Sequence, residues 1–124
     1  MSDNGNKALV LKHLQGFADI DSYLQTLGET VTEDLEWANS GFPTHHGLEQ
    51  AHEALHRLNE KLRGIRIECL NIAEDGNQVL TERIDYMIDK EGNTLLTLPC
   101  MGIFTIENGR IKSWRDYFDG SAFK

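Results

Sequence analysis

Two kinds of hydrophobic pattern divide the chain. In the first half, apolar residues recur every three or four positions, which is the period of one helix face. This pattern is clearest from Leu48 to Arg63 and recurs over residues 7–18 and 22–27. The first half therefore predicts three helices, followed or separated by a strand at 30–37 and a loop at 39–46.

Polar residues and glycines mark where these helices are expected to begin and end. Asn6 precedes the first helix, and Asp19 and Asp21 both precede the second, so their side chains are candidate caps. Gly28 is expected to end the second helix and Gly64 the third, because glycine readily takes the left-handed conformation after a helix.

The second half reads as strands. Apolar and polar residues alternate over four segments separated by short turns rich in glycine and asparagine. The segments are 65–73, 79–88, 95–106 and 111–118. Consecutive hairpins form an antiparallel meander, and helices followed by strands indicate an α+β fold. We expect the helices to cover one face of a curved sheet.

Composition narrows the class of protein. The chain has 124 residues, which suits a single domain over 1–124, and its formal net charge is −8. This charge argues against nucleic acid and anionic membranes as main partners. The chain contains no apolar run long enough for a membrane span and starts with polar residues, so we expect a cytoplasmic protein. Cys69 and Cys100 are expected to be reduced.

The strand 79–88 carries charges in an unusual place. Because strand side chains alternate between faces, Thr81, Arg83, Asp85 and Met87 share one face. A sheet covered by helices has an apolar inner face. Arg83 and Asp85, two positions apart on a central strand, therefore either face solvent or are buried as a pair.

The last strand repeats this feature. Trp114, Asp116 and Phe118 share a face, so an Asp116 in open solvent would leave both aromatic rings exposed beside it. Asp116 is therefore expected to face an enclosed space lined by aromatic rings. We expect it to meet Arg83 and Asp85 there.

Two interpretations of this trio remain open. A guanidinium bridging two carboxylates can hold one of them ionised as a base while the other, desolvated, stays protonated as an acid. The same residues also suit a structural ion network buried in the core. Trp37 and Asn39, which share a face at a strand end, add a group that can hold water, although Asn39 equally suits the start of a turn.

Residues 52–56 match the zinc-protease pattern H-E-x-x-H. We reject a zinc site here. Glu53 and His56 lie away from the leucine face of the helix, and no third ligand follows in the expected pattern. The sequence also contains no glycine-rich phosphate loop, and it implies no metal and no organic cofactor.

The face opposite Arg83 is also partly apolar. It carries Ile84, Tyr86 and Ile88. With helices on one side of the sheet, a second subunit is the natural cover for the other side, which predicts a homodimer.

Residues 79–119 resemble the limonene-1,2-epoxide hydrolase family. The resemblance rests on the segments 79–85 (VLTERID), 102–104 (GIF) and 108–119 (NGRIKSWRDYFD), and it continues more faintly from Glu33 through the loop at 43–47. It implies the cone-shaped α+β fold of nuclear transport factor 2, which SnoaL-like proteins share, with a mostly antiparallel mixed sheet and helices on its concave face.

The resemblance also implies roles for residues. Asp116 would be the base that activates water, Asp85 the acid that protonates the epoxide oxygen, and Arg83 the bridge between them. Asn39 matches the family's water-binding Asn, whereas Trp37 stands where the family has Tyr. The indole N–H can donate a hydrogen bond but cannot accept one. Four residues fall at positions of the apolar substrate wall: Met87, Leu98, Cys100 and Phe118.

The sequence thus predicts an epoxide hydrolase without cofactor that turns a small apolar epoxide and water into a vicinal diol. Two alternatives remain. One is an isomerase or cyclase of the same fold, in which a single Asp moves a proton next to a carbonyl. The other is a non-catalytic module that binds a small ligand in an apolar pocket.

Overall fold

A computed structural model describes residues 5–123. Its helices are α1 (Asn6–Gly16), α2 (Ile20–Thr30), α3 (Gly47–Lys61) and the short 3-10 helix η1 (Gly120–Phe123). Its strands are β1 (Val31–Asn39), β2 (His45–His46), β3 (Leu62–Asp75), β4 (Gln78–Asp89), β5 (Thr94–Glu107) and β6 (Arg110–Tyr117). Within the described residues, no helix combines the length and the apolar character that crossing a membrane requires.

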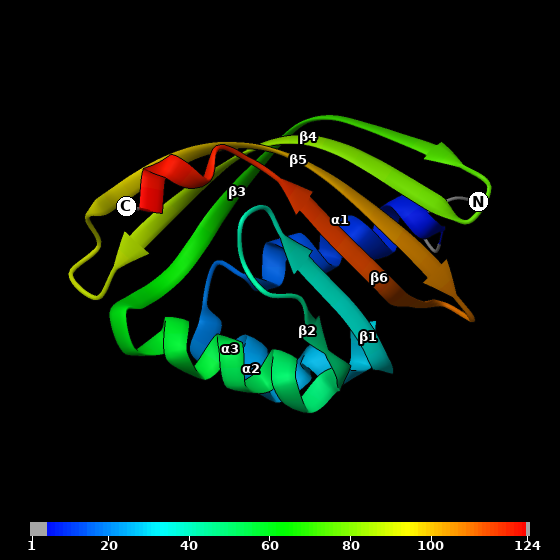
Figure 1. Cartoon of the computed structure of the whole chain (residues 1–124), viewed down its shortest axis with the longest axis horizontal. Helices are drawn as coiled ribbons and strands as arrows, with labels where there is room; N and C mark the ends of the chain where they lie inside the picture. The colour runs from blue at the N-terminus through cyan, green and yellow to red at the C-terminus, as the bar shows by residue number, and fades with distance from the viewer. Residues whose placement is uncertain (1–4, 124) are drawn as a thin grey trace.

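The six strands form one curved sheet. Their order is β2-β1-β6-β5-β4-β3, with β1 and β6 parallel and the other neighbours antiparallel. Figure 1 shows the long strands β3 to β6 arching over the three helices, so that α1, α2 and α3 fill the concave side. The predicted α+β architecture is confirmed.

The core lies between the helices and the inner face of the sheet. Val10, Leu14 and Phe17 of the first helical segment and Leu55 of α3 are almost fully buried there. The apolar faces of the helices pack against the apolar side chains on the inner face of the sheet. Burial of these two surfaces drives the packing.

Gly64 has a different role from the predicted helix end. It lies in β3, where a Cβ would come within 2.1 Å of the Ala18 carbonyl oxygen. The Ile65 amide donates to the Phe17 carbonyl oxygen at 2.7 Å. Gly64 therefore allows the start of β3 to cross directly against the end of α1.

Four other local expectations meet the structure with different results. Asp19 caps α2, because its Oδ1 accepts from the Ser22 amide at 3.2 Å. Asn6 is not a cap: it is the first residue of α1, after Gly5. Gly28 does not end α2, which runs on to the buried Thr30. Strand β2 also forms inside the predicted loop 39–46.

Candidate active site

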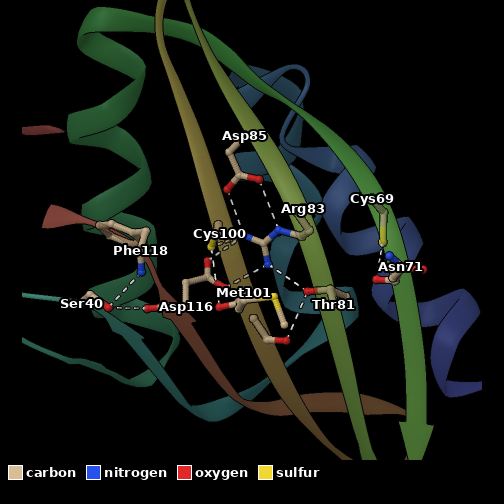
Figure 2. Close-up of polar contacts among 11 residues, drawn as sticks. Ser40, Cys69, Asn71, Thr81, Arg83, Asp85, Cys100, Met101, Asp116 and Phe118 are labelled. Carbon is tan, nitrogen blue, oxygen red and sulfur yellow. Dashed lines mark hydrogen bonds and ion pairs between the residues drawn. The ribbon is translucent and has the colours of Figure 1, made fainter.

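The charged trio comes together on the inner face of the sheet. Arg83 and Asp85 stand two positions apart on β4, and Asp116 reaches them from β6 across the intervening strand β5. Figure 2 shows the Arg83 guanidinium lying between the two carboxylates. Strand parity alone therefore predicted the correct face for all three residues.

The guanidinium binds both carboxylates with two hydrogen bonds each. Arg83 Nε and Nη2 donate to Asp85 Oδ1 and Oδ2 at 3.2 and 2.9 Å. Arg83 Nη1 and Nη2 donate to Asp116 Oδ1 and Oδ2 at 2.9 and 3.0 Å. This fork geometry is specific to arginine, and a lysine could not hold both acids in the same way.

The trio is buried. Arg83, Asp85 and Asp116 are 1%, 8% and 7% exposed. Burial raises the pKa of Asp116, and the positive charge of Arg83 offsets part of this rise. Burial alone would lower the pKa of Arg83, but the two carboxylates raise it above its ordinary value. Arg83 thus stays charged, while Asp116 has a higher proton affinity than an exposed aspartate.

The backbone around Asp116 is held by Ser40, directly after β1. The Ser40 amide and hydroxyl both donate to the Asp116 carbonyl oxygen, at 3.1 and 3.3 Å. The Ser40 hydroxyl also accepts from the Phe118 amide at 3.1 Å, as Figure 2 shows. Ser40 therefore ties the end of β1 to the backbone at Asp116 and directly after β6.

The water-binding candidates lie next to Asp116. In the parallel pair of β1 and β6, Asn39 is in register with Asp116, and Trp37 with Trp114. Among residues 5–123, no hydrogen bond to the Asn39 side chain is found, and the buried Trp37 Nε1 also lacks a partner. The Trp37 N–H is thus enclosed in the core, whereas the half-buried Asn39 is the residue in register with Asp116.

The four predicted wall residues lie on the same inner face. Leu98 and Cys100 on β5 are in register with Asp85 and Arg83, and both are buried. Met87 and Phe118 extend the row on β4 and beyond β6, and they are half-buried. These four side chains thus place apolar surface beside the trio.

Cys100 also touches the charged trio. Arg83 Nη2 donates to its sulfur at 3.2 Å. Burial, and then the charge of Asp116, raise the pKa of the Cys100 thiol to about 12. The thiol therefore stays protonated and weakly nucleophilic at neutral pH. Cys69, on β3, is likewise a free thiol, as predicted.

Ligand atoms of Asp85, Cys100 and Asp116 all lie within 4.8 Å of one another. Such a donor set can suit a cation, but the Arg83 guanidinium donates to all three residues and already supplies the positive charge. The residues therefore fit arginine better than a metal. In the H-E-x-x-H segment, Glu53 and His56 are exposed on α3, as the helical period predicts.

Two residues near the trio were given no role from the sequence. Thr81 Oγ1 lies 3.4 Å from Arg83 Nη1, and Gly102 faces Asp116 in the register of β5 and β6. A glycine inside a central strand is a signal for close approach of another group. That signal was present in the sequence and could have pointed to Gly102.

The arrangement defines the class of protein. Three helices on the concave face of a mostly antiparallel sheet, with buried polar groups inside, form the cone-shaped fold of nuclear transport factor 2. An NTF2-like protein of unknown function from Burkholderia pseudomallei K96243 superposes with a TM-score of 0.80 over 99% of this chain and 95% of its own, at 18% identity. A SnoaL-like protein from Jannaschia sp. CCS1 gives 0.78 over 95% and 88%, at 20% identity. These two similarities show the fold alone.

The family follows from the sequence comparison. Residues 7–123 match the limonene-1,2-epoxide hydrolase catalytic domain, and the chain belongs to this family. Epoxide hydrolase EphG of Mycobacterium tuberculosis (strain ATCC 25618 / H37Rv) is 34% identical over 94 residues, which are 76% of this chain and 61% of that protein. The structure of an M. tuberculosis LEH-like epoxide hydrolase is similar with a TM-score of 0.74 and 30% identity, over 94% of this chain and 78% of that one.

Proposed function

We propose that this protein is a cofactor-independent epoxide hydrolase that adds water to a small apolar epoxide in one step and forms a vicinal diol. The observation that carries the proposal is the Arg83 guanidinium bonded to two buried carboxylates, Asp85 and Asp116. In this proposal Asp116 is the base, Asp85 is the acid, and Arg83 bridges them.

The charge balance of the trio supports acid and base roles. With both aspartates ionised, the buried trio carries a net charge of −1, which burial disfavours. Uptake of one proton by the carboxylate pair neutralises it. The pair then contains one acid and one base, the stoichiometry that epoxide hydrolysis needs.

The reaction follows from this state. Asn39 and Asp116 hold a water molecule between β1 and β6, and Asp116 takes one of its protons. The water oxygen attacks an epoxide carbon, the carbon–oxygen bond of the ring breaks, and Asp85 gives its proton to the epoxide oxygen. The proton gained by Asp116 returns to Asp85 through solvent. No covalent bond to the protein forms.

The side chains around the trio support the proposed substrate class. Met87, Leu98, Cys100 and Phe118 offer apolar surface beside the trio, which suits a terpene- or cycloalkene-type epoxide. The protonated thiol of Cys100 is compatible with an electrophilic substrate, because a thiolate there would itself open the epoxide.

Diol formation tests the proposal. Limonene oxide and cyclohexene oxide are incubated with the wild type, Asp116→Asn and Asp85→Asn, and diols are separated by chiral gas chromatography. We expect diol from the wild type and a loss of at least ~100-fold in each variant, since general acid–base groups contribute about 10²–10⁴-fold. Asp34→Asn, an exposed aspartate paired with Lys112, is the matched control and should keep wild-type activity.

Two results would count against the proposal. An active Asp116→Asn variant would remove Asp116 as the base. Absence of diol from a folded wild type, with turnover of an enone or ketosteroid, would favour an isomerase, and ligand binding without turnover would favour a binding module.

We also propose that two copies pair through the convex face of the sheet. Leu80, Met101 and Tyr117 are exposed on β4, β5 and β6 of this face. Glu82 and Arg115 flank this apolar strip on opposite sides, so a copy turned by a two-fold axis places opposite charges together. Light scattering should give a dimer for the wild type and a monomer for Met101→Glu; a monomeric wild type would contradict the pairing.

A further inference from the structure

The Nη1 end of Arg83 has a second partner besides Asp116. Nη1 carries two hydrogens, and one of them is used by Asp116 Oδ1 at 2.9 Å. The other faces Thr81 Oγ1 at 3.4 Å. Figure 2 shows Thr81 on the side of the guanidinium away from Asp85. Thr81 is 1% exposed, so no solvent can replace its oxygen.

The direction of the Thr81 hydroxyl is set by β5. The Thr81 O–H donates to the Gly102 carbonyl oxygen at 3.2 Å, across the register of β4 and β5. A hydroxyl has one hydrogen and two lone pairs. With the hydrogen committed to Gly102, a lone pair is left to face Arg83 Nη1. Thr81 is therefore an acceptor of defined orientation.

The backbone of Gly102 lies directly against the Nη1 end of the guanidinium. A Cβ at Gly102 would lie 2.4 Å from Arg83 Nη1, 2.5 Å from Asp116 Oδ1 and 3.1 Å from Thr81 Oγ1. Three polar atoms thus converge above one glycine Cα. The guanidinium lies against the β5 backbone at this point, and Thr81 borders it on the β4 side.

We propose that Thr81 is a positioning residue for the hydrolysis proposed above, which fixes the Nη1 end of the Arg83 guanidinium against Asp116. Without the hydroxyl, one buried N–H of the guanidinium loses its acceptor. The guanidinium keeps two bonds to each carboxylate, but its Nη1 end loses one of its two contacts, so this end can tilt away from Asp116. Thr81 thereby controls how strongly Arg83 favours the ionised form of Asp116.

The consequence for activity has a defined sign. Arg83 lowers the proton affinity of Asp116 against the effect of burial. A weaker contact raises the pKa of Asp116 further, and a base must be ionised to act. Loss of the Thr81 hydroxyl should therefore move the acid limb of the pH profile of kcat/KM to higher pH and reduce kcat more than it changes KM.

The experiment compares Thr81→Val, which keeps the shape, with Thr81→Ser, which keeps the hydroxyl. With cyclohexene oxide as substrate, we expect kcat of Thr81→Val to fall about 10-fold at neutral pH, the size of one lost hydrogen bond to a charged group. Thr81→Ser should restore the wild-type pH profile. Thr105→Val, a threonine on the outer face of β5, is the matched control and should behave as the wild type.

A measurement without substrate separates this proposal from the proposed function. Carboxyl carbon NMR follows the titration of Asp116, which should move to higher pH in Thr81→Val even if the protein hydrolyses no epoxide. Thr81→Ala is the second hydroxyl-free variant and is judged in the same way if Thr81→Val does not fold. An unchanged Asp116 titration in a folded hydroxyl-free variant, or a Thr81→Ser variant that behaves like Thr81→Val, would overturn the positioning role.

Discussion

Trp37 and Trp114 stack face to face, with 4.5 Å between their ring centroids and 7° between their planes. They come from the parallel strands β1 and β6 and are in register, two residues before Asn39 and Asp116. The stacked rings therefore form an apolar surface next to the proposed water site. Its bulk limits the space on this side of Asp116.

Replacement of Trp37 by tyrosine should widen the substrate range. The smaller ring frees volume beside Asn39 and restores a hydroxyl that can both donate and accept. We expect the ratio of limonene oxide to cyclohexene oxide turnover to rise, with a loss of about 1–2 kcal/mol in the free energy of unfolding from the reduced ring stacking. Trp37→Phe separates the two effects, because it frees volume without a hydroxyl. An unchanged substrate ratio in both variants would show that Trp37 does not border the substrate.

A methyl group at Gly102 should disrupt the charged trio. It would fall within 2.5 Å of Arg83 Nη1 and Asp116 Oδ1, so both groups must move. We expect Gly102→Ala to lower diol formation by roughly 100-fold or more and stability by about 1–3 kcal/mol, measured by gas chromatography and urea unfolding. Gly28→Ala is the control: a Cβ there meets ordinary contact at 3.5 Å inside α2, and alanine should stabilise the helix by up to about 1 kcal/mol. A fully active Gly102→Ala would mean that the trio tolerates displacement.

Asp116→Asn should change the pH dependence of stability. Burial raises the pKa of Asp116 above 3.8, so the native state keeps this proton where the unfolded chain has lost it. The proton on Asp116 therefore stabilises the native wild type at low pH. This contribution to the unfolding free energy is lost as pH rises through the raised pKa of Asp116. In urea unfolding at a series of pH values, the unfolding free energy of the variant minus that of the wild type should therefore increase with pH above 3.8.

A surface aspartate supplies the control for this measurement. The pKa of Asp34 is lowered, first by the neighbouring Thr32 hydroxyl and then by Lys112, so the difference for Asp34→Asn should have the opposite sign in its pH dependence. A pH-independent difference for Asp116→Asn would contradict the raised pKa.

The Tyr23 hydroxyl links two buried polar side chains, those of His13 and Thr30. Thr30 Oγ1 donates to the Leu27 carbonyl oxygen at 3.1 Å, so the Tyr23 hydroxyl, 2.9 Å away, donates to Thr30 and accepts from His13 Nδ1. Burial, and then the charge of Arg83, lower the pKa of His13 to about 3, which keeps the ring neutral.

Tyr23→Phe should therefore be strongly destabilising. It leaves the buried His13 Nδ1–H without an acceptor and removes the donor to Thr30 Oγ1, and we expect a loss of about 1–3 kcal/mol in the free energy of unfolding by urea. The matched variant Tyr117→Phe removes a hydroxyl from a residue that is 56% exposed and should cost no more than about 0.5 kcal/mol. Equal stability of the two variants would mean that the buried chain of hydrogen bonds contributes nothing.

Much of the site could be predicted because strand geometry is local. Side chains alternate at every position, so the inner face of Arg83, Asp85 and Asp116 follows from the sequence once the strands are recognised. The helices of the first half and the hairpins of the second half follow from their periods in the same way. The resemblance to the epoxide hydrolase family then attached roles to this trio, and the family itself is confirmed.

Other features depended on which segments meet in space. Gly64 looks like a helix end in the sequence, but its lack of a side chain serves the contact with the Ala18 carbonyl oxygen. The register of Asn39 with Asp116 and the position of Thr81 above Gly102 join residues of different strands, and no local period encodes such pairings. Alternation of side chains along each strand was thus determined by the sequence itself. Tertiary packing decided how the strands pair and curve, and this places the Arg83 guanidinium between two buried carboxylates. The reason is that strand pairing depends on contacts between residues far apart in the chain.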